Sequence, residues 1–505
     1  MNNSISFKRK LLVISQRPSD FVEMNRCALA LHAKGCEIQF IYFHGNEHAE
    51  FELFDYLKEK FDDGTFSSVE IRRNGMSKSI KNKMLEKKSS FKESTTGKYL
   101  SRIWWERVWG PLRYRAECEE NFILYRFVKL VKALDIIRFY VAEKAQLKKI
   151  ISRLNPDAII LPEDVVGYNS PLLIKAGHEL NIPSIILPYT IANEQEAFRS
   201  LAGNSHYHLN APGNRTAGRL FPKWVKHANG LSLVRMPSPY IIGQVLTGTS
   251  PPNPWMMNSG FSNIIAVEND AMRDYYVSAG IPKTKIKVVG SVSDDHLAKF
   301  KLNKEQERLA LKAELLIPGR KPLLVIGGCP DQSGSCPAGF EYKDFDDFVM
   351  RLAEALEPMK RYYDVIVRPH PNNMRMGELL SAFGIQSTEI DTARLVALSD
   401  AYVAFASATV RWAISCEVPV LNYDLFHYDY DDFKGIPGVL HATSYDEVKQ
   451  GLESFIPSCE KFVDLNKEIK KSASRWGILD GHSTDRIAAL IDQVCNYKVV
   501  PRTSA

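Results

Sequence analysis

An arginine and a histidine that are each followed by proline have the clearest chemical potential in this sequence, within YYDVIVRPHPNN (362–373). The apolar run before them predicts a buried strand that ends at Arg368. Proline lacks a backbone donor and restricts the turn, which would hold Arg368 and His370 in fixed positions. This pairing favours anion binding or catalysis. The structural alternatives are a surface ion pair for Arg368 and a buried ring bonded to a carbonyl for His370.

Small residues follow two other apolar runs of the same region. Gly327 and Gly328, in IGGCPDQSG, would let the backbone approach a ligand closely, or would simply form a turn. Ser407 and Thr409, in FASATV, come just before a predicted helix whose N-terminus would attract phosphate. Their alternative role is to cap that helix, and the two roles are compatible.

Two adjacent carboxylates end a predicted strand in the first half of the chain, in LPEDV. Glu163 or Asp164 could act as a general base or as a nucleophile. Because successive residues of an extended chain point in different directions, we expect one of them at most to face a ligand. The structural alternative is an N-cap for the helix that begins near Ser170.

The stretch RWGILDGHSTDRIAALI contains a further arginine close to a helix start. Asp480 and Gly481 predict a turn, and Ser483 is expected to cap the last helix. A cation in the first turn of a helix opposes its dipole, so Arg486 should have an anionic partner, which is either Asp480 or a ligand.

The elements that must position these residues alternate between strand and helix, which is typical of parallel α/β folds. Strands are predicted in a first series at 11–15, 37–45, 158–161, 184–190, 263–270 and 285–291, and in a second series at 322–328, 364–367, 386–390, 401–405 and 418–424. Ligands of such sheets bind outside the carboxyl ends of the strands. All the candidate residues above follow a strand or begin a helix. Gly290 and Ser291, which end the last strand of the first series, are further candidates.

The length of 505 residues suits two domains. We expect a first α/β domain over 1–300, a second over 301–475 and a last helix within 476–505. A basic stretch at about 72–150 interrupts the first domain, and its second half predicts one or two long helices.

Tryptophans and basic residues alternate inside that insert. The residues are Trp104, Trp105, Trp109, Arg102, Arg107 and Arg113. Tryptophan favours the headgroup layer of a membrane and basic residues favour anionic lipid. Residues 72–115 therefore suggest contact with an inner-membrane surface, and the alternative is an ordinary insertion with a solvated charged face.

Composition excludes several classes of protein. The net charge of +6 is mild, so anionic ligands are favoured and nucleic acid is not required. There is no apolar run of transmembrane length, and the eight cysteines form no CxxC pair or zinc-ligand spacing. The N-terminal stretch LLVIS predicts a strand rather than a signal peptide. We expect a cytoplasmic protein with reduced thiols and no metal ion.

Four motifs together resemble the bacterial surface-polysaccharide glycosyltransferases of GT-B fold, a group that includes capsule and lipopolysaccharide transferases such as the Kdo transferases. The motifs are VIVRPHP, GSVSDD, FASATVRWAISCEVPVLNYD and DGHSTDRIAALI. The resemblance covers about 155–200 and 260–490. The layout is also similar to CDP-glycerol polymerases and UDP-GlcNAc 2-epimerases, although the basic insert and the absence of an obvious epimerase acid–base set depart from the latter.

The resemblance implies two Rossmann-like domains that face each other across a cleft, with the nucleotide sugar on the second and the acceptor on the first. Donor phosphate or sugar acid groups would be held by Arg368, His370, Ser407 and Thr409, with Gly290, Ser291, Gly327, Gly328, Ser483 and Arg486 as further donor contacts. The last helix would pack back towards the first domain. Members of this fold typically need no metal, because basic side chains and helix dipoles neutralise the leaving phosphate.

The leading hypothesis is therefore a glycosyltransferase that extends a surface polysaccharide or a lipid-linked glycan from a nucleotide sugar. Glu163 or Asp164 would activate the acceptor or attack the sugar, and His370 would assist catalysis. CMP-Kdo is a specific guess for the donor, because its carboxylate would suit an additional cation. The alternatives are a nucleotide-sugar 2-epimerase, a CDP-glycerol-type glycerophosphotransferase, and a glycan-binding or export-associated protein without catalysis.

Overall fold

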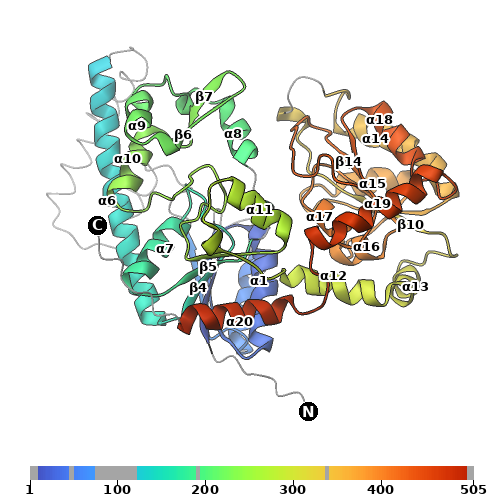
Figure 1. Ribbon diagram of the computed structural model, residues 1–505, viewed down its shortest axis with the longest axis horizontal. Helices are drawn as coiled ribbons and strands as arrows, with labels where there is room; N and C mark the ends of the chain where they lie inside the picture. The colour runs from blue at the N-terminus through green and yellow to red at the C-terminus, as the bar shows by residue number, and fades with distance from the viewer. Residues whose placement is uncertain are drawn as a thin grey trace. The chain divides into compact units, whose positions relative to one another are not determined.

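The computed structural model describes residues 9–44, 51–73, 122–188, 191, 194–335 and 340–496. The chain forms two compact units (Figure 1). The first comprises Met1–Ile265, Val277–Ile286 and Leu490–Ala505, and the second comprises Ala266–Tyr276 and Lys287–Ala489. Among the described residues, no helix is long and apolar enough to cross a membrane.

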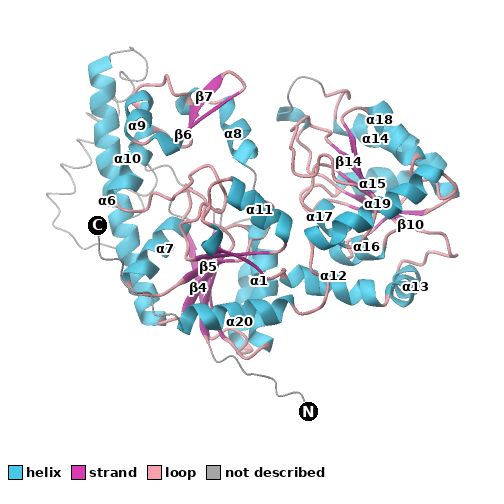
Figure 2. Ribbon diagram, viewed as in Figure 1, coloured by secondary structure: helices cyan, strands magenta, loops and turns pink. Residues whose placement is uncertain are grey.

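The first unit is built on a seven-stranded sheet with the order β3-β2-β1-β4-β5-β8-β9. Figure 2 labels β4 and β5 of this sheet among its magenta arrows. Its strands are β1 Lys10–Ser15, β2 Glu37–His44, β3 Ser68–Arg73, β4 Ala158–Leu161, β5 Ser184–Ile186, β8 Ile264–Val267 and β9 Ile286–Val288. The pairings from β3 through β8 are parallel. Both faces of a parallel sheet are covered, which explains why β1 and β4 are continuous apolar runs.

Helices and one hairpin surround this sheet. Their bounds are α1 Pro18–Ala33, α2 Phe51–Asp62, α6 Phe122–Leu154, α7 Ser170–Glu179, α8 Glu194–Ala202, α9 Asn214–Leu220, β6 Val225–Ala228, β7 Leu231–Val234 and α10 Ser238–Leu246. The predicted helical half of the insert is one helix of 33 residues, α6. Residues 74–121 lie outside the described ranges, and so do the tryptophans and arginines on which the membrane hypothesis rests.

The second unit contains a six-stranded, fully parallel sheet with the order β12-β11-β10-β13-β14-β15. Its strands are β10 Leu323–Gly327, β11 Asp364–Arg368, β12 Gln386–Ser387, β13 Ala401–Ala404, β14 Val420–Tyr423 and β15 Val439–Ala442. This second parallel sheet confirms the α/β prediction of two Rossmann-like folding units.

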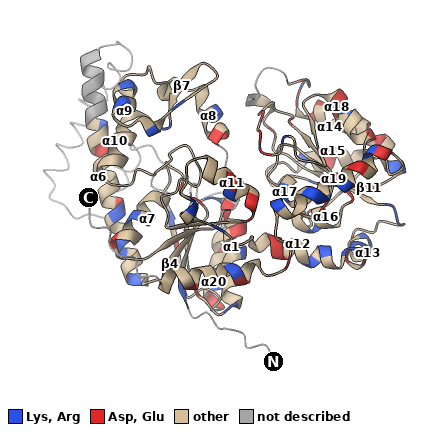
Figure 3. Cartoon of the chain, viewed as in Figure 1, with Lys and Arg blue, Asp and Glu red and all other residues tan. Residues whose placement is uncertain are grey.

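Among the helices associated with the second unit, α13, α18 and α19 carry charged residues of both signs (Figure 3). Their bounds are α11 Asp270–Ser278, α12 Val292–Leu302, α13 Lys304–Glu314, α14 Phe345–Leu356, α15 Arg375–Ala382, α16 Thr392–Leu398, α17 Val410–Ser415, α18 Tyr445–Glu453, α19 Glu460–Trp476 and α20 Ser483–Asn496. In α19, Leu465, Ile469 and Trp476 are buried at helical spacing. The last helix, α20, begins in the second unit and ends in the first.

Candidate functional site

The carboxyl ends of β10 and β11 meet in the second unit. Gly327 pairs in register with Arg368, and the next amide, Gly328 N, donates to Arg368 O at 2.8 Å. A Cβ on Gly328 would lie 2.6 Å from His370 N and 2.9 Å from Arg368 O. Only glycine therefore fits beside the Arg-Pro-His turn, so the predicted glycine pair and the predicted cationic turn form one structure.

The two side chains of this turn are held by local hydrogen bonds. Arg368 donates from Nε to Ile390 O at 3.1 Å and from Nη1 to Pro369 O at 2.5 Å, which leaves Nη2 without a hydrogen bond to the described residues. Asn372 N donates to His370 Nδ1 at 3.1 Å. Burial and the neighbouring Arg368 lower the pKa of His370. A neutral ring whose Nδ1 accepts a hydrogen bond carries its proton on Nε2, which can donate to an anion.

A chain of hydroxyl groups lies on the other side of Gly327. Tyr402 Oη is 2.8 Å from Thr409 Oγ1, which donates to Ser407 Oγ at 2.9 Å. A Cβ on Gly327 would lie 2.1 Å from Tyr402 Oη. We use "strand-end cluster" for the residues of this edge, which are Gly327, Gly328, Arg368, His370, Ser407 and Thr409.

Of the two predicted caps of the helix after β13, Thr409 does not cap it, whereas Ser407 Oγ accepts the backbone amide of Thr409 at 3.3 Å just before the helix. Thr409 is the N-cap residue of α17, but its side chain makes no capping hydrogen bond to the helix. The Thr409 hydroxyl forms a hydrogen bond with the Tyr402 hydroxyl instead. The helix itself, α17, has only six residues. The hydroxyl groups, rather than the helix dipole, are thus the polar groups that this edge could offer to a ligand.

In the first unit, Glu163 follows β4 and is completely buried. Its Oε1 accepts a hydrogen bond from Arg17 Nη2, whereas Oε2 has no hydrogen-bond partner among the described residues. Burial raises the pKa of Glu163 to about 8, and Arg17 opposes this shift. A buried carboxyl group with a pKa near neutrality and one unsatisfied oxygen has the properties of a general base or acid.

Asp164, its neighbour, is held in a different way. Its carboxylate accepts hydrogen bonds from the backbone amides of Ser259, Phe261 (2.9 Å) and Ser262 (3.1 Å). These bonds fix a loop and use both carboxylate oxygens, so the geometry favours Glu163 over Asp164 for chemistry. The expected N-cap role of this pair is wrong, because Asn169 is the N-cap residue of α7.

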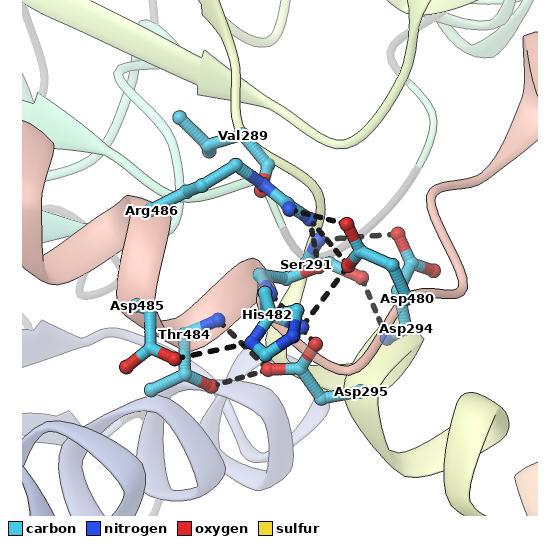
Figure 4. A network of polar contacts seen from close by, with 10 residues as sticks. Val289, Ser291, Asp294, Asp295, Asp480, His482, Thr484, Asp485 and Arg486 are labelled. Atoms are coloured by element: carbon cyan, nitrogen blue, oxygen red, sulfur yellow. Dashed lines mark hydrogen bonds and ion pairs between the residues drawn. The ribbon is translucent and has the colours of Figure 1, made fainter. Parts of the chain in front are cut away.

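The remaining predicted donor contacts form a network of polar bonds in the second unit (Figure 4). Ser291 caps α12 in a reciprocal capping box with Asp294. Ser483 does not cap α20 as expected, because Asp295 accepts the amides of Ser483 and Thr484, each at 2.7 Å.

Arg486 has the partner that the sequence offered as its structural alternative. It donates to Asp480 from Nη1 at 2.7 Å and to the backbone oxygen of Val289 from Nε at 2.8 Å (Figure 4). Gly290 has φ +81°, and a Cβ there would lie 2.1 Å from Ser483 Oγ. Gly290 thus packs against Ser483 and Arg486. Among the described residues, no hydrogen bond joins Gly290, Ser291, Ser483 or Arg486 to the strand-end cluster.

Two residues near Glu163 were missed by sequence reasoning. Arg17 follows β1 in the stretch SQRPSD, so it repeats the Arg-Pro signal of Arg368 and could have been found. Arg235 follows β7, and burial lowers the pKa of its guanidinium while Glu163 opposes that shift. Nothing in the local sequence of Arg235 marks it, because only the folded chain brings it near the carboxyl end of β4.

The described residues contain no group of three or more acidic, histidine or cysteine side chains that could hold a metal ion. The six cysteines within the described ranges are free, and Cys118 and Cys336 lie outside them.

Two Rossmann-like units with parallel sheets are the elements of the GT-B fold class. No protein-family model and no curated protein matches the chain. Solved structures do match along almost its entire length. UDP-GlcNAc 2-epimerase from Neisseria meningitidis is 13% identical with a TM-score of 0.50, and the match covers 96% of this chain and 100% of that one.

A putative UDP-N-acetylglucosamine 2-epimerase from Listeria monocytogenes is 12% identical with a TM-score of 0.51, and the match covers 98% of each chain. A glycosyltransferase from Rickettsia africae is 12% identical with a TM-score of 0.45, covering 97% of this chain and 99% of that one. At these identities the likeness shows the fold alone, and it is carried by the two matches whose TM-scores reach 0.50.

Proposed function

We propose that the protein is a GT-B glycosyltransferase that moves a sugar from a nucleotide-activated donor to a growing surface polysaccharide or a lipid-linked glycan. The observation that carries this proposal is Glu163, a completely buried carboxyl group with a pKa of about 8 and one oxygen without a hydrogen-bond partner among the described residues. A group of this kind can take the proton of an acceptor hydroxyl. It could instead attack the anomeric carbon, if the enzyme retains configuration.

The strand-end cluster would hold the donor. Arg368 Nη2 and His370 Nε2 are the donors that its local hydrogen bonds leave available, and the Ser407 and Thr409 hydroxyls lie on the other side of Gly327. Fixed donors of this kind stabilise the negative charge that develops on a departing phosphate. The proposal therefore assigns phosphate stabilisation to side chains and includes no metal ion.

Three finer parts of the proposal rest on the sequence. The donor would be CMP-Kdo, whose carboxylate would add an acidic group for Arg368 to bind. The protein would work in the cytoplasm, and residues 72–115 would bring it to the inner-membrane surface that carries the acceptor. Because residues 74–121 lie outside the described ranges, that membrane contact rests on composition alone.

A nucleotide-sugar screen tests the donor assignment. We expect one class among CMP-, CDP-, UDP- and GDP-sugars to raise the unfolding temperature, since a ligand at 100 times its Kd stabilises a protein by about 2.7 kcal/mol. The measurement is thermal unfolding with each nucleotide sugar at millimolar concentration, with the free sugar as the control. No stabilisation by any nucleotide sugar would contradict the proposal and would favour a glycan-binding protein.

A nucleotide-sugar 2-epimerase is the second candidate, because two solved structures with TM-scores of 0.50 and 0.51 are named as UDP-GlcNAc 2-epimerases, one of them putative. The two functions differ in their need for an acceptor. We expect UDP-GlcNAc to remain unchanged when it is incubated with the protein alone, as followed by NMR of the anomeric proton. Formation of the 2-epimer without an acceptor would replace the transferase by the epimerase.

A further inference from the structure

Arg235 is a half-buried arginine whose guanidinium makes no hydrogen bond to any described residue. Its backbone amide donates to Trp224 O at 2.9 Å, which anchors the residue directly after β7. Its side-chain Nε is buried and has no hydrogen-bond partner among the described residues. Leaving a charged donor unsatisfied inside a protein is costly, so such a group calls for an explanation.

Packing between two loops places Arg235 beside Glu163. Val166, three residues after Glu163, belongs to the same buried cluster as Val234, and the partly buried Met236 packs against that cluster. Val234 and Met236 flank Arg235. Gly167 has φ +96°, and a Cβ there would lie 4.0 Å from Met236 Cε. The loop after β4 thus packs directly on the loop after β7.

Aromatic side chains complete this part of the first unit. Arg17 lies over the ring of Tyr168 at 4.8 Å from the ring centre, and the same guanidinium bonds Glu163. Burial lowers the pKa of Arg235, and Tyr207, Tyr168 and Glu163 are the groups close enough to oppose that shift. Both phenols are partly exposed. Glu163 therefore has one cation that is bonded to it and a second cation nearby that is not.

We propose that Arg235 binds an oxyanion of the acceptor, a carboxylate or a phosphate, so that the acceptor of this enzyme is an acidic glycan. The inference rests on the proposed function, in which Glu163 activates the acceptor hydroxyl. The guanidinium presents a planar set of donors that suits either oxyanion. Arg17 is paired with Glu163 and with Asp20, whereas no ion pair joins Arg235 to a carboxylate of the described residues, so an oxyanion of the acceptor would give Arg235 its partner.

Matched sugar probes test this proposal. Binding of glucose, glucuronic acid and glucose 6-phosphate to the full-length protein is measured by calorimetry, which separates a neutral sugar from a carboxylate and from a phosphate. We expect the wild type to bind at least one charged probe about tenfold or more tightly than glucose, which is the usual effect of a charge-assisted hydrogen bond.

The decisive variant is Arg235→Gln. It should lose the preference for the charged probe and keep its weak affinity for glucose, and Arg235→Lys should recover part of the preference. Arg219→Gln is the matched control, because Arg219 is an exposed arginine of the nearby helix α9. No preference in the wild type, or an unchanged preference in Arg235→Gln, would overturn the inference.

The same variants separate this inference from the proposed function. Stabilisation by a nucleotide sugar should be equal in wild type and Arg235→Gln, because the strand-end cluster belongs to the second unit. A protein that binds a nucleotide sugar but shows no effect of Arg235 on charged probes refutes the acidic acceptor alone. A protein that binds the charged probes through Arg235 but binds no nucleotide sugar refutes the transferase.

Discussion

Glu163→Gln should reduce the rate of sugar transfer by about 10²–10⁴-fold, the usual contribution of a positioned general base. Glutamine keeps the size of the side chain and can still contact Arg17, so the fold should survive. The effect should appear in kcat rather than in donor affinity, because Glu163 belongs to the first unit and the strand-end cluster to the second. Initial rates at saturating donor measure it.

The pH profile gives this variant a sharper test. A general base works when it is deprotonated, so wild-type kcat/KM should rise with pH through the raised pKa of about 8 and then level off. That rising limb should be missing in Glu163→Gln. Glu52→Gln is the control, because Glu52 is an exposed carboxylate on α2. Retention of both rate and profile in Glu163→Gln would remove Glu163 from the mechanism.

His370→Ala should lower kcat by about 10²–10³-fold, as the loss of one fixed donor to a developing anion does in other enzymes. His370 is well suited to this role because its pKa is lowered by burial and by Arg368, and its Nδ1 already accepts the amide of Asn372. The ring would therefore act as a neutral Nε2–H donor. Steady-state rates with the donor found in the nucleotide screen measure the loss.

Two comparisons make the His370 experiment specific. His482→Ala removes an exposed imidazole of the same unit and should leave the rate unchanged. His370→Ala should unfold at nearly the wild-type temperature, since the turn is also fixed by the contact of Gly328 N with Arg368 O. A wild-type rate in His370→Ala would remove His370 from the catalytic residues.

The predictions of the sheets and of the residues at their strand ends were correct, because neighbouring residues alone determine these features. The parallel sheets were predictable because buried strands such as β1 and β10 are uninterrupted apolar runs. The grouping of Gly328, Arg368 and Thr409 at one edge followed from the rule that parallel strands present their carboxyl ends together.

The predictions were wrong where residues far away in the chain determine the hydrogen bonds of a side chain or of a helix end. The amides at the start of α20 are capped by Asp295, which lies 188 residues before Ser483. Asp164 looked as reactive as Glu163, because the loop at 259–262 that saturates its carboxylate lies almost a hundred residues away. Arg235 could not be found for the same reason. Local patterns give no information on which polar groups the folded chain leaves unsatisfied.

The position of α20 has a consequence for the order in which the protein can mature on the ribosome. Asp295 and Gly290 contact Ser483 near the start of α20, and Arg9, just before β1, donates to Asp492 near its end at 2.8 Å. These contacts can therefore form only after α20 has been synthesised. Domains usually fold one after another during synthesis. Here both units have contacts with a helix that lies far along the chain, so a chain truncated before α20 would lack these contacts in both units.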